Sequence, residues 1–287
     1  MRFGKPHHIR QLYLLGTLVV AVIVFFAASY LNRTIWLTEI DVTEIVAPEE
    51  LKKAFEQSAF GRRHHWFSFG NQEYLTRWEG KFVIALSGRP PHFWEQDDLV
   101  KFNRIVSEIE NLTGREVIIK DAYENRMASR GHNIMYDGYN SEYSKSFIIK
   151  FLKKVGFSQS VAKKIVDVSI CLVLPRSSLD SDNKIVYGSI DVMRKLSYSR
   201  RRFCMMNGLT QLMGFLGYTS LLPSSVFDLP ESDLQGFRIN DQILIRTLFD
   251  KRLKPGMKRD EAMVIAREII PQLVKAVKKE GVKALHQ

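Results

Sequence analysis

The sequence predicts an α+β domain, with a mixed sheet and a helical C-terminal half, behind a single N-terminal transmembrane helix. Short runs rich in β-branched residues alternate with amphipathic segments as far as residue 193, and only helical patterns follow. An uncharged apolar run near the N-terminus is the third observation. With 287 residues and 45% hydrophobic content, the chain can bury a core, which excludes a disordered or collagen-like protein.

Residues 12–30, LYLLGTLVVAVIVFFAASY, contain no charged side chain. A helix of about 20 such residues spans the hydrocarbon layer of a bilayer, which is roughly 30 Å thick. The residues before this run include three cations and no acid: Arg2, Lys5 and Arg10. Because cations flank the cytoplasmic end of a membrane helix, we expect residues 1–11 to be a cytoplasmic tail and residues 12–30 to be a signal anchor.

A cleaved signal peptide is the alternative, with Ala27 and Ser29 as a small-residue cleavage site, although the run exceeds the usual 7–15 apolar residues of such peptides. Both interpretations send the following residues out of the cytoplasm. We expect a juxtamembrane region over residues 31–74 and the main domain over residues 75–287.

The first half of the chain after the anchor predicts one short helix, one long helix and three strands. Pro48 opens the short helix over 47–55. The long helix over 94–114 has apolar residues at three- and four-residue spacings: Leu99, Phe102, Ile105, Val106, Ile109 and Leu112. The strands are expected over residues 81–88, 116–120 and 132–138.

The second half begins with a basic helical region over 141–167 and two strands over 168–174 and 184–193. Helices are then expected over residues 199–216, 239–250 and 258–279. The last has an apolar stripe, acids in its first turn and lysines near its end, as the helix dipole favours. This stripe predicts docking on the domain; an amphipathic helix lying on lipid remains the alternative.

The net charge of +11, from 42 Lys plus Arg against 31 Asp plus Glu, suits an anionic partner such as an envelope polyanion. The sequence contains no recognisable nucleic-acid module, so no nucleic-acid partner is expected. It also lacks GxSxG, GxxxxGK, GxGxxG and HExxH motifs. None of the seven histidines pairs with a Cys or a carboxylate at the spacing of a zinc site, and we expect no cofactor and no metal.

The most specific pattern runs through residues 200–262 and ends in LFDKRLKPGM at 248–257. It resembles DUF2927, a bacterial domain family of unknown function, over residues 75–265. The other matching residues are Arg77, Trp78, NLTGREV at 111–117, Cys171, Arg202, Cys204, Leu209, Thr210, Gln211, Gly214, Ser225, Val226, Phe227 and Asp241.

This resemblance implies a zincin-like fold, because the family looks like a relative of the zinc peptidases. In HExxHxxGxxH, two histidines one helical turn apart bind zinc, the glutamate polarises water, and a glycine turns the chain toward a third ligand. Counted from residue 207, the ligand positions are Asn207, Gln211 and Gly217, the base position is Gly208, and the turn glycine is Gly214. Ser225-Val226-Phe227 would stand at the turn that underlies the metal.

Amides are poor zinc ligands and glycine has no proton acceptor, so the resemblance implies a degenerate site without catalysis. Two interpretations of Asn207 and Gln211 stay open: a remnant of a ligand-binding cleft, or side chains that bond to each other or to the backbone.

Cys171 and Cys204 permit one disulfide if the strand of the first lies beside the helix start of the second. The closed loop would stabilise the fold by roughly 3–4 kcal/mol. Two buried free thiols are the alternative.

Together these features predict a membrane-anchored, non-catalytic interaction protein of the bacterial envelope. It would cross the inner membrane once, with its main domain in the periplasm and an envelope protein or polyanion as partner. The alternative is an active envelope hydrolase of peptides or polysaccharides. Its acid–base candidates are His132, Asp137, Asp228 and Asp241.

Overall fold

The computed structural model describes residues 44–61, 73–87, 96–121, 133–137, 142–154, 156–168, 171–177, 183–192, 197–228 and 236–287. The expected anchor over 12–30 and the tail before it lie outside these residues. Among the helices that the structure describes, none is long and apolar enough to cross a bilayer.

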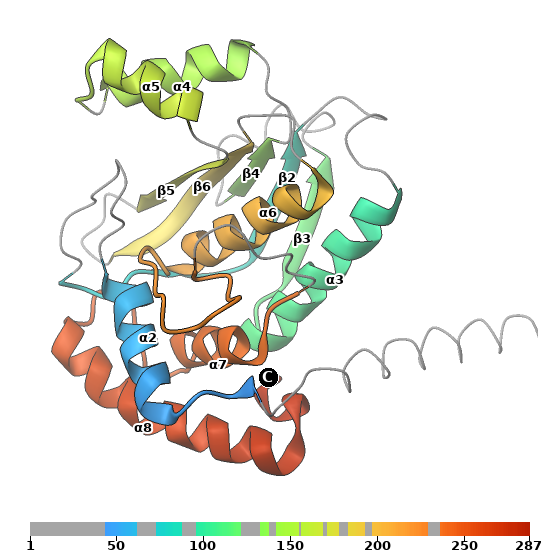
Figure 1. Ribbon diagram of the computed structural model, residues 1–287, viewed down its shortest axis with the longest axis vertical. Helices are drawn as coiled ribbons and strands as arrows, with labels where there is room; N and C mark the ends of the chain where they lie inside the picture. Colours follow the sequence, from blue (N-terminus) through green and yellow to red (C-terminus); the bar gives the residue numbers. More distant parts are fainter. Residues whose placement is uncertain are drawn as a thin grey trace, which may run out of the picture.

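A mixed sheet forms the centre of the domain (Figure 1). Its strands are β1 (Arg77–Trp78), β2 (Phe82–Ser87), β3 (Val117–Asp121), β4 (Asn133–Asp137), β5 (Cys171–Ser177) and β6 (Lys184–Val192). Strands β3, β2, β4 and β6 lie side by side in that order and run parallel, and β1 also pairs with β6 in parallel. Strand β5 pairs with β6 antiparallel. The predicted α+β class and mixed sheet are therefore confirmed.

Helices α3 (Gln96–Thr113) and α6 (Tyr198–Met213) lie together on one face of this sheet (Figure 1). Parallel neighbours such as β2 and β3 need a crossover connection, and α3 provides it. The apolar stripe of α3 faces the core, as its spacing predicts: Phe102, Ile105, Ile109 and Leu112 are buried.

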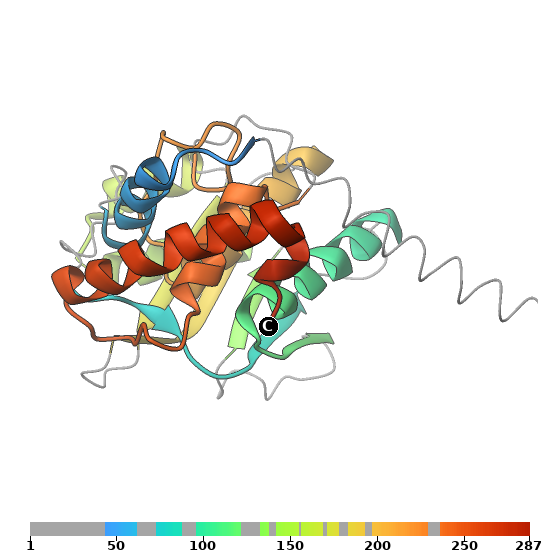
Figure 2. The same ribbon diagram turned by 90° about the horizontal axis from the view of Figure 1, so that it is seen from below.

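The second helical layer contains α2 (Pro48–Phe60), α7 (Ile239–Leu248), α8 (Arg259–Glu280) and the short 3₁₀ helix η3 (Val282–Leu285) (Figures 1 and 2). Helix α2 lies in the stretch that the sequence assigned to a juxtamembrane region. Its Leu51 and Phe55 are fully buried in the main core. The core therefore begins before residue 75.

Helix α8 packs against α2, α7 and η3 and continues through Pro271 (Figure 2). Ile269 and Ile270 are almost fully buried, as are Met263 and Val277. Docking of the C-terminal helix on the domain is thus confirmed, and its apolar face is not available to lipid.

The basic region over 141–167, expected as one helical stretch, consists of two helices, α4 (Glu142–Lys154) and α5 (Gln159–Val168). Gly156 adopts a φ of +104° between them. The Ser158 carbonyl accepts the Ala162 N–H and so begins the first turn of α5. The two helices share a small separate core of Ile148, Leu152, Ala162, Ile165 and Val166 with Leu172 of β5.

Candidate functional site

Helix α6 carries the positions that the resemblance assigns to a zinc site. It ends at Gly214, which has a φ of +131° and donates its N–H to the Gln211 carbonyl. A Cβ on Gly214 would lie 2.1 Å from the Thr76 carbonyl oxygen. Only glycine fits here, for both its conformation and its close approach to the chain before β1.

Gly208 faces the sheet. A Cβ built on it would lie 2.7 Å from Cδ1 of Ile190 in β6. The fit is mutual, because a Cβ on Gly188 of β6 would lie 2.1 Å from Cδ2 of Leu212 in α6. The position that would carry a general base is therefore filled by the contact between α6 and β6, with no space for a glutamate side chain.

Gly217 packs against the end of α2. Its N–H donates to the Ser58 carbonyl at 2.7 Å, and a Cβ on it would lie 2.0 Å from the Gln57 carbonyl oxygen. The position expected for a third metal ligand is thus closed by backbone, which cannot move aside as a flexible side chain can.

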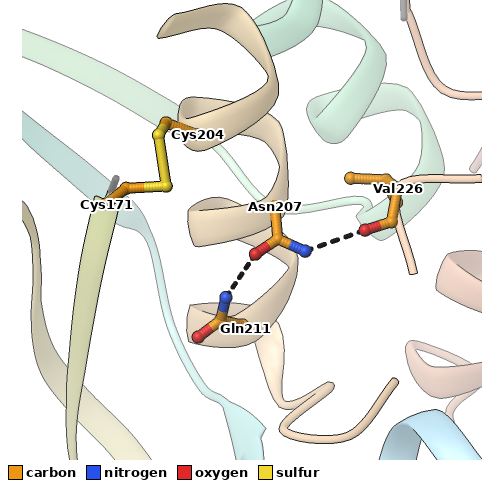
Figure 3. The surroundings of a disulfide bond; sticks show 5 residues. All are labelled: Cys171, Cys204, Asn207, Gln211 and Val226. Atoms are coloured by element: carbon orange, nitrogen blue, oxygen red, sulfur yellow. Dashed lines mark hydrogen bonds between the residues drawn. A yellow bond between two sulfur atoms is a disulfide. The ribbon is translucent and has the colours of Figure 1, made fainter. Parts of the chain in front are cut away.

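Asn207 and Gln211 lie one turn apart on α6, both nearly fully buried (Figure 3). Nε2 of Gln211 donates to Oδ1 of Asn207 at 2.5 Å, and Nδ2 of Asn207 donates to the Val226 carbonyl at 2.8 Å. The two amides bond to each other and to backbone, which is the second of the two interpretations that the sequence left open. Their bonding joins α6 to the turn at 225–228.

Asp241 holds the same turn from the other side. This fully buried carboxylate accepts hydrogen bonds from the Ser225 hydroxyl and from the N–H of Val226 at 3.3 Å. It also accepts the N–H of Arg238 at 3.0 Å, which caps the start of α7. Burial raises the pKa of Asp241 to about 6, against the lowering effect of these hydrogen bonds, Ser225 first.

A second, half-buried carboxyl belongs to Glu108 of α3. Nε2 of Gln242 donates to its Oε1 at 2.7 Å and also to the Phe237 carbonyl at 3.0 Å. Burial raises the pKa of Glu108 to about 8, and the charge of Asp241 adds to the rise, while Arg104 and a backbone hydrogen bond from Phe237 oppose it. Polar contacts therefore extend from α6 through the turn to α7 and α3.

Of the four residues considered for an active hydrolase, the structure describes the side chains of Asp228 and Asp241. Asp241 is buried in the network above, and the N–H of half-buried Asp228 closes the turn on the Ser225 carbonyl at 3.2 Å. Asp137 ends β4, in register with Asp191 of β6. His132 lies outside the described residues. A fully buried Asp241 cannot touch a substrate in this arrangement.

Cys171 of β5 and Cys204 of α6 are joined by a disulfide, with their Cα atoms 5.8 Å apart (Figure 3). Cys204 is fully buried. The bond connects the antiparallel strand to the same helix that carries Asn207, one turn further along.

The residues at the assigned positions do not fit a zinc ion. Oδ1 of Asn207 already accepts from Gln211, and Gly208 and Gly217 have neither a side chain nor space for one. Within the described ranges, no group of three or more His, Cys, Asp or Glu side chains is arranged to hold a metal.

Arg77 has a role that sequence reasoning missed. It is buried, and its Nη1 donates to the carbonyls of Leu248 at 3.0 Å and Leu253 at 2.8 Å. The segment 248–257 also pairs with the chain before β1, since the Leu75 N–H donates to the Met257 carbonyl at 2.7 Å. The resemblance includes both motifs, Arg77-Trp78 and the segment 248–257, but only the fold shows that they contact each other.

A model of the family described as "Protein of unknown function (DUF2927)" matches residues 48–268. The match begins at the first residue of α2 and ends within α8. Neither a curated protein nor a solved structure matches the chain. Because the family model covers most of the sequence, from the first core helix to the last, the chain belongs to the DUF2927 family.

Proposed function

We propose that this protein is a membrane-anchored, non-catalytic interaction module of the bacterial envelope, built on a degenerate zincin-like domain. The observation that carries the proposal is the packing around α6. The positions for two ligands hold amides that bond to each other, and those for the base and the third ligand touch β6 and α2.

The zincin-like relationship draws support from the arrangement rather than from the chemistry. Two polar residues one turn apart lie on a helix that ends at a glycine, and a turn at 225–228 lies against the first of them. This is the order of parts in HExxHxxGxxH sites, where a further turn underlies the metal. Here each part contributes hydrogen bonds to the fold instead of ligands.

The membrane location rests on residues 12–30, whose length and lack of charge suit a single span, and on the cations before them. The disulfide between Cys171 and Cys204 agrees with a domain outside the cytoplasm, because such bonds persist in oxidising compartments. A periplasmic domain carried by the inner membrane is consistent with both observations.

Two assays on the full chain test the proposal. In spheroplasts, external protease should digest the domain and spare the cytoplasmic tail; complete protection of the domain would contradict the topology. Purified chain should not hydrolyse peptides or envelope polysaccharides, with or without a chelator. Turnover that a chelator abolishes would overturn the non-catalytic assignment, and chelator-resistant turnover lost in Asp228→Asn would favour the hydrolase alternative.

A further inference from the structure

Helices α4 and α5 form a basic hairpin that stands apart from the rest of the fold. Residues 142–168 contain six lysines against two acids, a net charge of +4 out of +11 for the whole chain. The buried side chains that the structure describes in the hairpin form a small core with Leu172 of β5 and are not part of the main core. It lies at the end of the domain opposite α2 and α8 (Figure 1).

Five of the six lysines of this hairpin are exposed, while five of its described apolar side chains form the small core between the two helices. Ile148, Leu152, Ile165 and Val166 are at most 2% exposed. The exposed lysines are Lys150, Lys153, Lys154, Lys163 and Lys164. Lys153 donates to Gln159 at 3.2 Å and so connects the two helices across their turn. No ion pair in the described part of the chain joins the other four to a carboxylate.

The kind of cation indicates the kind of partner. Protein interfaces are enriched in arginine and tryptophan and depleted in lysine, and pockets for a single phosphate or carboxylate favour the bidentate guanidinium. The hairpin has six lysines and neither arginine nor tryptophan. Lysine ammonium groups on flexible side chains, spread over two helices, suit a surface whose negative charge is also spread out. A bilayer with anionic headgroups is such a surface.

We propose that the α4–α5 hairpin binds the surface of an anionic phospholipid bilayer. None of the apolar side chains that the structure describes in the hairpin is exposed, so the contact with the headgroups is made by its lysines, and the binding weakens as salt screens the charges. The proposal extends the function proposed above by naming a partner, and it rests on that function only for the presence of a membrane. Because the hairpin is remote from α2, it can bind a bilayer other than the one that holds the anchor.

The test uses the full chain, incorporated through its N-terminal segment into neutral phosphatidylcholine vesicles. These vesicles are mixed with labelled acceptor vesicles, either neutral or containing phosphatidylglycerol, and their association is measured by co-flotation. We expect association with the anionic acceptors alone, and its loss in high salt.

A quadruple variant then tests the hairpin itself: K150Q/K154Q/K163Q/K164Q. Each lysine near an anionic surface strengthens binding roughly fivefold, so the loss of all four should lower the affinity about 600-fold. The matched control removes four exposed lysines from the C-terminal elements α8 and η3: K275Q/K278Q/K279Q/K283Q. It carries the same change in charge and should keep most of the affinity. Both variants should melt like the wild type, since all eight side chains are exposed.

Equal association with neutral acceptors, or equal losses in the two variants, would overturn the proposal. Binding of soluble polyphosphate or heparin by a chain that does not bind anionic vesicles would also overturn it, because the partner would then be a polyanion. A chain that fails to incorporate into neutral vesicles would instead contradict the anchor. In that case, binding by the hairpin is measured by mixing the wild type and the two variants directly with anionic vesicles.

Discussion

Removal of the disulfide should destabilise the domain strongly without changing its fold. The bond joins residues 33 apart in sequence, and the chain entropy of an unfolded loop of that length corresponds to about 3.7 kcal/mol at 25 °C. A domain of this size loses about 2–4 °C of melting temperature per kcal/mol. The expected decrease is therefore about 7–15 °C.

The assay compares the oxidised wild type, the reduced wild type and Cys171→Ala/Cys204→Ala by urea unfolding followed by circular dichroism. Alanine avoids burying a hydroxyl at position 204, where the side chain is fully enclosed. With an unfolding slope of about 1–3 kcal/mol/M, the midpoint should fall by roughly 1–4 M, to similar values for the reduced protein and the variant.

Equal midpoints for all three samples would refute the reasoning, because closing the loop would then contribute nothing to stability. A thiol titration that finds two reactive cysteines in the natively purified, oxidised protein would refute the pairing itself. If the variant alone were unstable and the reduced protein were not, the loss would come from the cavity left by alanine rather than from the bond.

Three further substitutions test the contacts around the site by urea unfolding. Arg77→Ala should lower the free energy of unfolding by about 3 kcal/mol, because three carbonyls lose a buried charged donor. The control, Arg252→Ala, breaks a surface pair and should lower it by under about 1 kcal/mol. Equal losses in the two variants would contradict the role of Arg77. Glu108 keeps its proton to about pH 8 when folded but loses it near 4.5 when unfolded, so this residue lowers stability as pH rises between those values. Glu108→Gln should reduce the loss between pH 5 and pH 8, and an unchanged pH profile would refute the shift. Gly208→Ala should cost about 1–2 kcal/mol, because overpacking outweighs the better helix propensity, and it should cost less in an Ile190→Ala background, where all three contacting carbons are removed. No coupling between the two substitutions would contradict the contact.

Local patterns predicted the elements well because each depends on its own spacing of apolar residues. The stripe of α3 and the amphipathic pattern of α8 are confirmed by burial of the expected faces. The pattern over 141–167 did not separate α4 from α5, since both helices are basic and the short break between them, where Gly156 has a positive φ, does not interrupt the charge pattern. Helix α2 was assigned outside the domain because a short helix does not reveal in its sequence what it packs on.

The site was harder to predict, because burial there is a property of distant neighbours. Asn207 and Gln211 have a spacing that suits either ligands or a mutual hydrogen bond, and only the position of the 225–228 turn distinguishes them. Glu108 looks like an ordinary polar residue on an amphipathic helix. It becomes a half-buried carboxyl with a raised pKa because Gln242 and Phe237 lie against it from α7 and the loop before it.

The zinc content of the purified chain tests the central claim most directly. Full-length protein would be dialysed against a zinc buffer and its bound metal measured by plasma mass spectrometry, with Asn207→Ala/Gln211→Ala as the matched variant. Since the amides bond to each other and the positions of Gly208 and Gly217 are closed, we predict far less than one zinc per chain in both proteins. One tightly held zinc in the wild type, lost in the variant, would show that α6 still carries a metal site and would contradict the account.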